Sequence, residues 1–237
     1  MRHCSGAWRA IALAAFTIGR LAYAAPGDGA RVLFIGNSLT TVNDVPGLVA
    51  RLAAASHQRF DYRTVAFDGY SLEDHWNRGE ARRAIAGGGW SIVVLQQGPS
   101  ALPESRVQLR ASVRRFDLEI RRAGARTALY MVWPSAERLG DFEAVRTSYD
   151  LAARDVGGLL LPAGQAWREA WRLDSHLPLY GADRFHPTMA GSYVAALVMF
   201  EAFFERQPMP VAVANVSAAQ SALLQQAAHA AVTRIPR

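Results

Sequence analysis

At 237 residues, the chain is long enough for one well-buried α/β domain and too short for two domains of ordinary size. Hydrophobic residues make up 51% and charged residues 19% of the chain, which excludes extensive disorder. The formal charge of +6 comes from 26 basic and 20 acidic residues, and no arginine-rich arm, zinc-finger spacing or RNP-like strand accompanies it. We therefore expect no nucleic acid partner.

The first 25 residues have the pattern of an export signal. Arg2 and Arg9 precede an apolar stretch over residues 10–18, and residues 22–24 (Ala-Tyr-Ala) resemble a small-x-small cleavage site. The apolar stretch is about half of the roughly 20 residues that a membrane-spanning helix needs. An uncleaved anchor is the weaker alternative.

Cleavage would leave residues 26–237 as the mature domain, periplasmic or secreted and without stable insertion in a membrane. The single cysteine, Cys4, lies inside the signal. The mature chain would then have no disulfide, thiolate metal site or cysteine nucleophile. The oligomeric state stays open.

Beyond the signal, apolar runs alternate with longer amphipathic stretches, a pattern typical of a parallel sheet covered by helices on both faces. The expected strands are residues 31–35, 60–66, 91–96, 126–132 and 159–161. The expected helices are residues 45–56, 80–86, 104–123 and 142–156, one long helix from Pro187 to about Glu205, and a C-terminal helix over 217–233. The prediction is an α/β fold, a three-layer α/β/α sandwich with a five-stranded parallel sheet.

Ligands of such sheets bind beyond the carboxyl ends of the strands, which directs attention to the loop after the first strand. Gly36 permits a tight turn there, and Ser38 follows near the start of the next helical segment. Its hydroxyl could serve as a nucleophile, and its backbone N–H could help to stabilise an oxyanion. The alternative is that Ser38 only caps a helix.

A second loop, residues 181–187 (GADRFHP), precedes the last long helix. A serine nucleophile needs a general base, and the imidazole of that base needs an acceptor to hold its tautomer. Asp183 and His186 could supply both from one segment. The alternative is that Asp183 caps the helix and that His186 is an ordinary surface residue.

Taken together, a serine near the amino terminus and Asp-x-x-His near the carboxyl terminus resemble the SGNH (GDSL-like) hydrolases. VLFIGNSLT is similar to the nucleophile block of this family, Gly69 in FDGYSL to its glycine block, and DRFHP to its Asp-x-x-His block. The more specific likeness is to a bacterial branch with Gly-Asn-Ser in the first block. The resemblance implies a flavodoxin-like SGNH fold, Ser38, Asp183 and His186 as the catalytic triad, and the N–H groups of Ser38 and Gly69 as oxyanion donors.

The third block departs from the family, whose Gly-x-Asn-Asp supplies an asparagine side chain to the oxyanion. This chain has Gln96-Gln97-Gly98-Pro99-Ser100 instead. A glutamine amide could replace the asparagine, as in the sialate O-acetylesterase branch. The order of preference is Gln97, then Gln96, then Ser100, with the alternative that both glutamines only tie loops together.

Three further residues near the expected site are assigned structural roles or left with two alternatives. Asn37 takes the place of the family aspartate and is expected at most to fix its loop, while His75 lies with Trp76 in an expected helix beside the site. Trp133 could line an acyl or sugar pocket or pack in the core. No cluster of side chains has metal-ligand spacing, so we expect neither metal nor cofactor.

The sequence thus predicts an esterase that removes a short acyl group, most plausibly acetyl, from a small-molecule or glycan ester. The same triad could transfer the acyl group to a sugar hydroxyl instead of water. A third alternative is a catalytically silent carbohydrate-binding or envelope protein that retains the fold.

Overall fold

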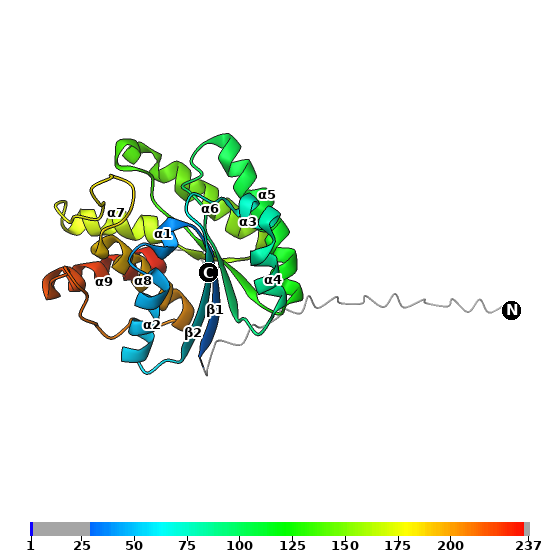
Figure 1. Cartoon of the computed structure of the whole chain (residues 1–237), viewed down its shortest axis with the longest axis horizontal. Coiled ribbons are helices and arrows are strands. Elements are labelled where there is room, and N and C mark those ends of the chain that lie inside the picture. Colours follow the sequence, from blue (N-terminus) through cyan, green and yellow to red (C-terminus); the bar gives the residue numbers. More distant parts are fainter. Residues whose placement is uncertain (2–28, 235–237) are drawn as a thin grey trace.

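The computed structural model describes residue 1 and residues 29–234 (Figure 1). Its centre is a five-stranded parallel sheet in the order β2-β1-β3-β4-β5. The strands are β1 (Ala30–Gly36), β2 (Phe60–Ala66), β3 (Ile92–Leu95), β4 (Arg126–Tyr130) and β5 (Leu159–Leu161). This is the flavodoxin-like order, in which the strand order reverses between β1 and β3. The predicted fold class is confirmed.

Helices cover both faces of the sheet (Figure 1). One face carries α2 (Val45–Ala55), α7 (Ala163–Leu173), α8 (Met189–Phe204) and α9 (Ala218–Thr233), which contact one another. The other carries α3 (Leu72–Arg78), α4 (Glu80–Ala86), α5 (Pro103–Arg122) and α6 (Phe142–Val156). A short helix α1 (Ser38–Thr41) follows β1, and a 3-10 segment η1 (Ala136–Asp141) precedes α6.

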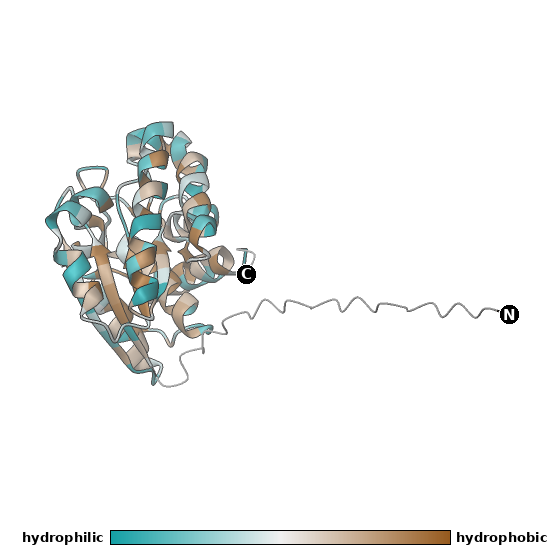
Figure 2. Cartoon of the chain, turned by 90° about the vertical axis from the view of Figure 1, so that its right-hand side faces the viewer, coloured by the Kyte–Doolittle hydropathy of each residue, from teal (hydrophilic) through white to brown (hydrophobic). Residues whose placement is uncertain are grey.

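Burial explains which segments became strands and helices. All four residues of β3 are buried, as expected of a central strand in a parallel sheet. The edge strand β2 instead exposes polar side chains, and α8 is apolar all round because α2, α7 and α9 pack against it. Figure 2 shows the strands in hydrophobic colours, while the helices that cover them mix hydrophilic and hydrophobic residues.

The last long helix begins two residues later than predicted. Thr188 is its N-cap and accepts a hydrogen bond from the Gly191 N–H, so the first helical residue is Met189. Pro187 instead pairs with Tyr180 in an isolated β-bridge. The proline therefore belongs to the loop that carries Asp183 and His186.

Helix α7 was not predicted from the sequence. Its buried residues Ala163, Ala166, Trp167 and Ala170 repeat at helical spacing, so a signal was present. Trp167 is fully buried and stacks on Trp133, with 3.8 Å between the ring centroids.

The expected export signal lies outside the described residues. Within residues 29–234, no helix combines the length and the apolar character needed to cross a membrane.

Candidate active site

The turn after β1 presents Ser38 at the carboxyl edge of the sheet. Asn37 is the N-cap of α1, and its side-chain oxygen accepts a hydrogen bond from the Leu39 N–H. Ser38 is therefore the first helical residue and not the cap, which leaves its hydroxyl free to point elsewhere. The Ser38 Oγ lies 2.9 Å from the Nε2 of His186, a residue 148 positions further along the chain.

The other ring nitrogen of His186 contacts Asp183. Nδ1 lies 2.5 Å from Asp183 Oδ2, while Asp183 Oδ1 accepts hydrogen bonds from the N–H groups of Phe185 and His186. The bond from His186, followed by those two backbone bonds, lowers the pKa of Asp183 to about 2. An ionised carboxylate only accepts, so Nδ1 carries the proton and Nε2 can accept the proton of the Ser38 hydroxyl.

Several contacts hold the loop of Asp183 and His186 in place. The Gly181 N–H donates to the His186 carbonyl at 2.7 Å, and the Asn43 side chain donates to the carbonyl of Pro187 at 3.1 Å. Trp133 Nε1 donates to the carbonyl of Phe185 at 3.1 Å. Asn43 and Trp133 thus tie the loop to the turn before α2 and to the segment that follows β4.

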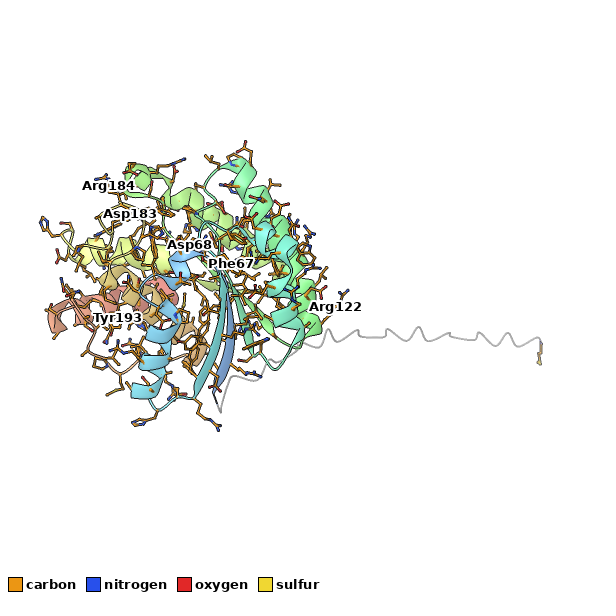
Figure 3. All side chains as sticks on the ribbon, viewed as in Figure 1. Phe67, Asp68, Arg122, Asp183, Arg184 and Tyr193 are labelled. Carbon is orange, nitrogen blue, oxygen red and sulfur yellow. The ribbon has the colours of Figure 1, made fainter. Side chains whose placement is uncertain are left out.

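Arg184, within the same loop, adopts a left-handed backbone conformation with φ of 61°. Its carbonyl accepts from the Ala136 N–H at 2.8 Å, and its guanidinium pairs with Glu137 at the surface. Figure 3 shows Arg184 at the upper left edge of the molecule, beside Asp183. The arginine side chain thus lies at the surface with Glu137.

Two backbone N–H groups are available near the Ser38 hydroxyl. Among the described residues, neither the Ser38 N–H nor the Gly69 N–H has a hydrogen-bond acceptor. Gly69 has φ of 73° in a turn closed by the Tyr70 N–H and the Phe67 carbonyl, and a Cβ placed on it would meet no atom within 4 Å. Open space therefore adjoins the Gly69 backbone.

The two glutamines after β3 differ in their hydrogen bonds. Gln96 is fully buried, and its amide group donates to Asn37 Oδ1 at 2.9 Å and to the Gln97 carbonyl at 2.8 Å. Both of its amide hydrogens are therefore engaged. Gln97 accepts from the Leu72 N–H and donates to Ser100 Oγ at 2.8 Å, which leaves its second amide hydrogen without an assigned acceptor.

Ser100 is engaged as well. It has φ of 56°, accepts from Gln97 and donates to the carbonyl of Gly98 at 3.1 Å. Of the three residues considered as the side-chain oxyanion donor, Gln97 alone retains a donor that these contacts do not use.

His75 and Trp133 have supporting contacts. His75 is fully buried in α3, and its Nε2 lies 2.7 Å from the Gly36 carbonyl. Burial, the largest cause, lowers the pKa of His75, and its Nδ1 has no hydrogen-bond partner among the described residues. Trp133 is fully buried, so it packs in the core while supporting the loop of Asp183 and His186.

Sequence reasoning missed Asn43 and the partners of Asn37. Asn43 has φ of 58° and reaches from the turn before α2 to Pro187 and Ser192. A left-handed asparagine followed by Asp44 and Pro46 is a loop signal, but it does not identify a partner more than a hundred residues away. Among residues 29–234, no three metal-ligating side chains converge on one point.

Comparison with known proteins gives the family. No protein-family model matches the chain, and a search of curated proteins finds no match. A solved structure from Slackia heliotrinireducens, described as an SGNH hydrolase, is 30% identical with a TM-score of 0.64, covering 74% of this chain and 99% of that chain. The chain belongs to the SGNH hydrolase family. By its family, the chain is assigned to the hydrolases.

Other solved structures resemble this SGNH hydrolase in fold. A DUF4886 family protein from Bacteroides uniformis has a TM-score of 0.75 at 22% identity, with 87% of this chain and 96% of that chain covered. A variant of an acetyl xylan esterase from Geobacillus stearothermophilus has a TM-score of 0.58 at 20% identity, with coverages of 75% and 95%. These likenesses concern the fold, and in this chain the parallel sheet places the loops after β1 and β3 at its carboxyl edge.

Proposed function

We propose that this SGNH hydrolase is a serine esterase in which Ser38 is the nucleophile, His186 the general base and Asp183 the residue that orients His186. The proposal rests on the continuous path from Asp183 Oδ2 to His186 Nδ1 at 2.5 Å and from His186 Nε2 to Ser38 Oγ at 2.9 Å. A nucleophile, a base and an orienting carboxylate in hydrogen-bond contact are the arrangement that serine acyl transfer requires.

The reaction follows from these contacts. Ser38 Oγ attacks the acyl carbonyl while its proton passes to His186 Nε2, and the resulting imidazolium is stabilised by the Asp183 carboxylate. Collapse of the tetrahedral intermediate breaks the ester bond, and Nε2 returns the proton to the departing alcohol. Water then attacks the acyl-enzyme, again with His186 as base, and releases the acid and free Ser38.

The oxyanion of each tetrahedral intermediate would be bound by the Ser38 N–H, the Gly69 N–H and the Gln97 side-chain amide. The support is that both backbone groups have no other acceptor among the described residues, and that Gln97 has one amide hydrogen to spare. Loss of one such donor typically costs about 100- to 1,000-fold in rate.

For the substrate, we propose a short acyl ester, acetyl in the first place, on a carbohydrate. The fold is shared with an acetyl xylan esterase, and export from the cell, expected from residues 1–25, would bring the enzyme to extracellular or envelope glycans. Transfer of the acyl group to a sugar hydroxyl is the alternative, because an alcohol can take the place of water in the second half of the reaction. A silent binding protein is disfavoured by the connected triad geometry.

The experiment compares purified enzyme and its Ser38→Ala variant on p-nitrophenyl acetate, butyrate and octanoate, and on acetylated xylooligosaccharides with acetate release as the readout. The proposal predicts turnover of the acetyl ester that falls with chain length and disappears in the variant. Equal turnover by both proteins would reject Ser38 as nucleophile. Turnover that rises with chain length would reject the acetyl preference alone.

A further inference from the structure

Asn37 makes three side-chain hydrogen bonds that a carboxylate could not make together. Its Oδ1 accepts from the Leu39 N–H at 3.1 Å and from Gln96 Nε2 at 2.9 Å, while its Nδ2 donates to the Tyr70 carbonyl at 3.0 Å. Leu39 N–H can only donate and the Tyr70 carbonyl can only accept, so these partners fix the orientation of the amide. An aspartate at this position would place a charged oxygen against the Tyr70 carbonyl.

Gln96 holds Asn37 from the other side through a reciprocal pair of hydrogen bonds. The backbone N–H of Asn37 donates to Gln96 Oε1 at 2.8 Å, and Gln96 Nε2 returns a bond to Asn37 Oδ1. The Thr40 hydroxyl donates to the same Oε1 at 2.8 Å. Asn37 is 6% exposed and Gln96 0%, so water competes little for these hydrogen bonds. A polar group of this network that lost its partner would lower the stability of the fold, because it would stay buried without a hydrogen bond.

The bond from Asn37 to Tyr70 joins the two segments that carry the proposed backbone oxyanion donors. Ser38 follows Asn37, and Gly69 precedes Tyr70, so each N–H lies one residue from an end of this link. The Gly69 turn is fixed at its other end, because the Gly36 carbonyl accepts from the Phe67 N–H at 3.2 Å. The distance between the two N–H groups is thereby set by hydrogen bonds at both ends of the Gly69 turn.

We infer that Asn37 is a positioning residue for the oxyanion hole, and that its side-chain amide, held by Gln96, sets the Gly69 N–H against the Ser38 N–H. This inference rests on the proposed esterase function. Among the described residues, the Asn37 side chain has no hydrogen bond to the triad side chains, so it acts through the oxyanion donors, when negative charge develops on the carbonyl oxygen. Interactions of that kind affect kcat and leave KM nearly unchanged.

Two substitutions separate this role from a general role in stability. Asn37→Asp keeps the shape and the two bonds to Oδ1 but loses the donor to Tyr70. Asn37→Ser keeps a helix-capping oxygen without adding charge and removes the link to Tyr70. The control is Asn215→Asp, which makes the same chemical change at an exposed turn.

The variants are assayed on p-nitrophenyl acetate, and a separate sample of each is titrated with a fluorophosphonate to count its active sites. The inhibition constant of a trifluoromethyl ketone reports directly on the oxyanion hole, because addition of Ser38 Oγ turns the carbonyl oxygen of the ketone into an oxyanion. Both Asn37 variants should lose about 10- to 100-fold in kcat per active site with KM changed by less than about twofold. The inhibition constant of the ketone should rise by a similar factor, and Asn215→Asp should match the unmodified enzyme.

Unchanged kcat and unchanged ketone affinity in folded Asn37→Ser would overturn the inference. A loss of rate that the loss of titratable active sites explains fully would also overturn it, because Asn37 would then serve folding alone. If Asn37→Asp does not fold, Asn37→Ser carries the test. The absence of Ser38-dependent turnover in the unmodified enzyme is a different result, since it rejects the proposed function itself.

Discussion

The Nε2 atom of His75 donates a hydrogen bond to the carbonyl oxygen of Gly36, 2.7 Å away and two residues before Ser38. The carbonyl can only accept, so the proton is on Nε2 and the unpartnered Nδ1 is deprotonated in the neutral ring. The ring also contacts Phe67 and Tyr70, with centroid distances of 5.8 and 5.4 Å. His75 therefore supports both the Ser38 turn and the Gly69 turn in its neutral form.

This arrangement predicts that His75 lowers the stability of the fold in acid. Burial lowers the pKa of His75 in the folded state. Below the pKa of about 6.5 that the imidazole has in the unfolded chain, the unfolded chain therefore binds a proton at His75 that the folded chain does not bind. Stability is full above that pH and declines as the pH falls below it. Urea unfolding at pH 7.5 and pH 5 should show a smaller acid loss for His75→Phe than for the unmodified enzyme. The same loss in both proteins would show that His75 does not stay neutral.

Asp183→Asn tests the orienting carboxylate. An amide can present its NH₂ group to Nδ1, which would favour the tautomer with the proton on Nε2, where it cannot accept from Ser38. In a comparable triad such a change costs about 10⁴-fold in kcat, and we expect a loss of that order with little change in KM. Steady-state kinetics on p-nitrophenyl acetate measure kcat and KM of the variant. A loss of kcat below tenfold would argue against the assigned role of Asp183.

The Asp183 carboxylate also predicts a pH dependence of stability. Its pKa of about 2 lies below that of an unfolded aspartate, so its stabilising effect is present above about pH 4 and is lost as the pH falls toward 2. Asp183→Asn should lack this component. Thermal unfolding followed between pH 5 and pH 2.5 should show a shallower acid decline for the variant, and parallel curves would contradict the assignment.

Gln97→Ala tests the side-chain oxyanion donor. Removal of a donor to the transition state should lower kcat by about 100-fold, whereas Ser100→Ala, which removes only a partner of Gln97, should have a smaller effect. The ratio of kcat between the two variants is the measurement. A Gln97→Ala enzyme with nearly full kcat would leave the two backbone N–H groups as the whole oxyanion hole.

Gly69→Ala tests the backbone donor of the Gly69 turn. No atom lies within 4 Å of the added Cβ, so any effect comes from the backbone φ of 73° and not from a clash. A side chain at such an angle costs roughly 1–2 kcal/mol, which the turn can relieve by rotating the Gly69 N–H away. We expect a lower kcat with an almost unchanged KM. Gly140→Ala, which also adds a Cβ in open space at an exposed site, is the control and should change neither constant.

The sequence predicted the sheet well because β1, β3, β4 and β5 are largely buried apolar runs, and β2 and β5 have the predicted bounds. Helix α7 was missed although Ala166, Trp167 and Ala170 have helical spacing. The start of α8 differs because Thr188 caps the helix while Pro187 pairs with Tyr180, and tertiary contacts of this kind leave no local pattern.

The site was predictable in outline and not in detail. Ser38, Asp183 and His186 stood out because their order along the chain is typical of the family, and the structure brings their side chains together. The sequence could not separate Gln96 from Gln97, since two adjacent glutamines differ only in the direction in which each leaves the strand. Only the fold shows that Gln96 turns to Asn37 and Gln97 to Leu72 and Ser100.

Covalent labelling shows whether Ser38 is an activated nucleophile. The enzyme is treated with a fluorophosphonate at neutral pH, digested and analysed by peptide mass spectrometry, with Ser38→Ala and His186→Ala treated in parallel. We expect one adduct, on Ser38, that is absent from Ser38→Ala and forms far more slowly in His186→Ala. An adduct on another residue, or labelling of Ser38→Ala at the rate of the unmodified enzyme, would contradict this expectation.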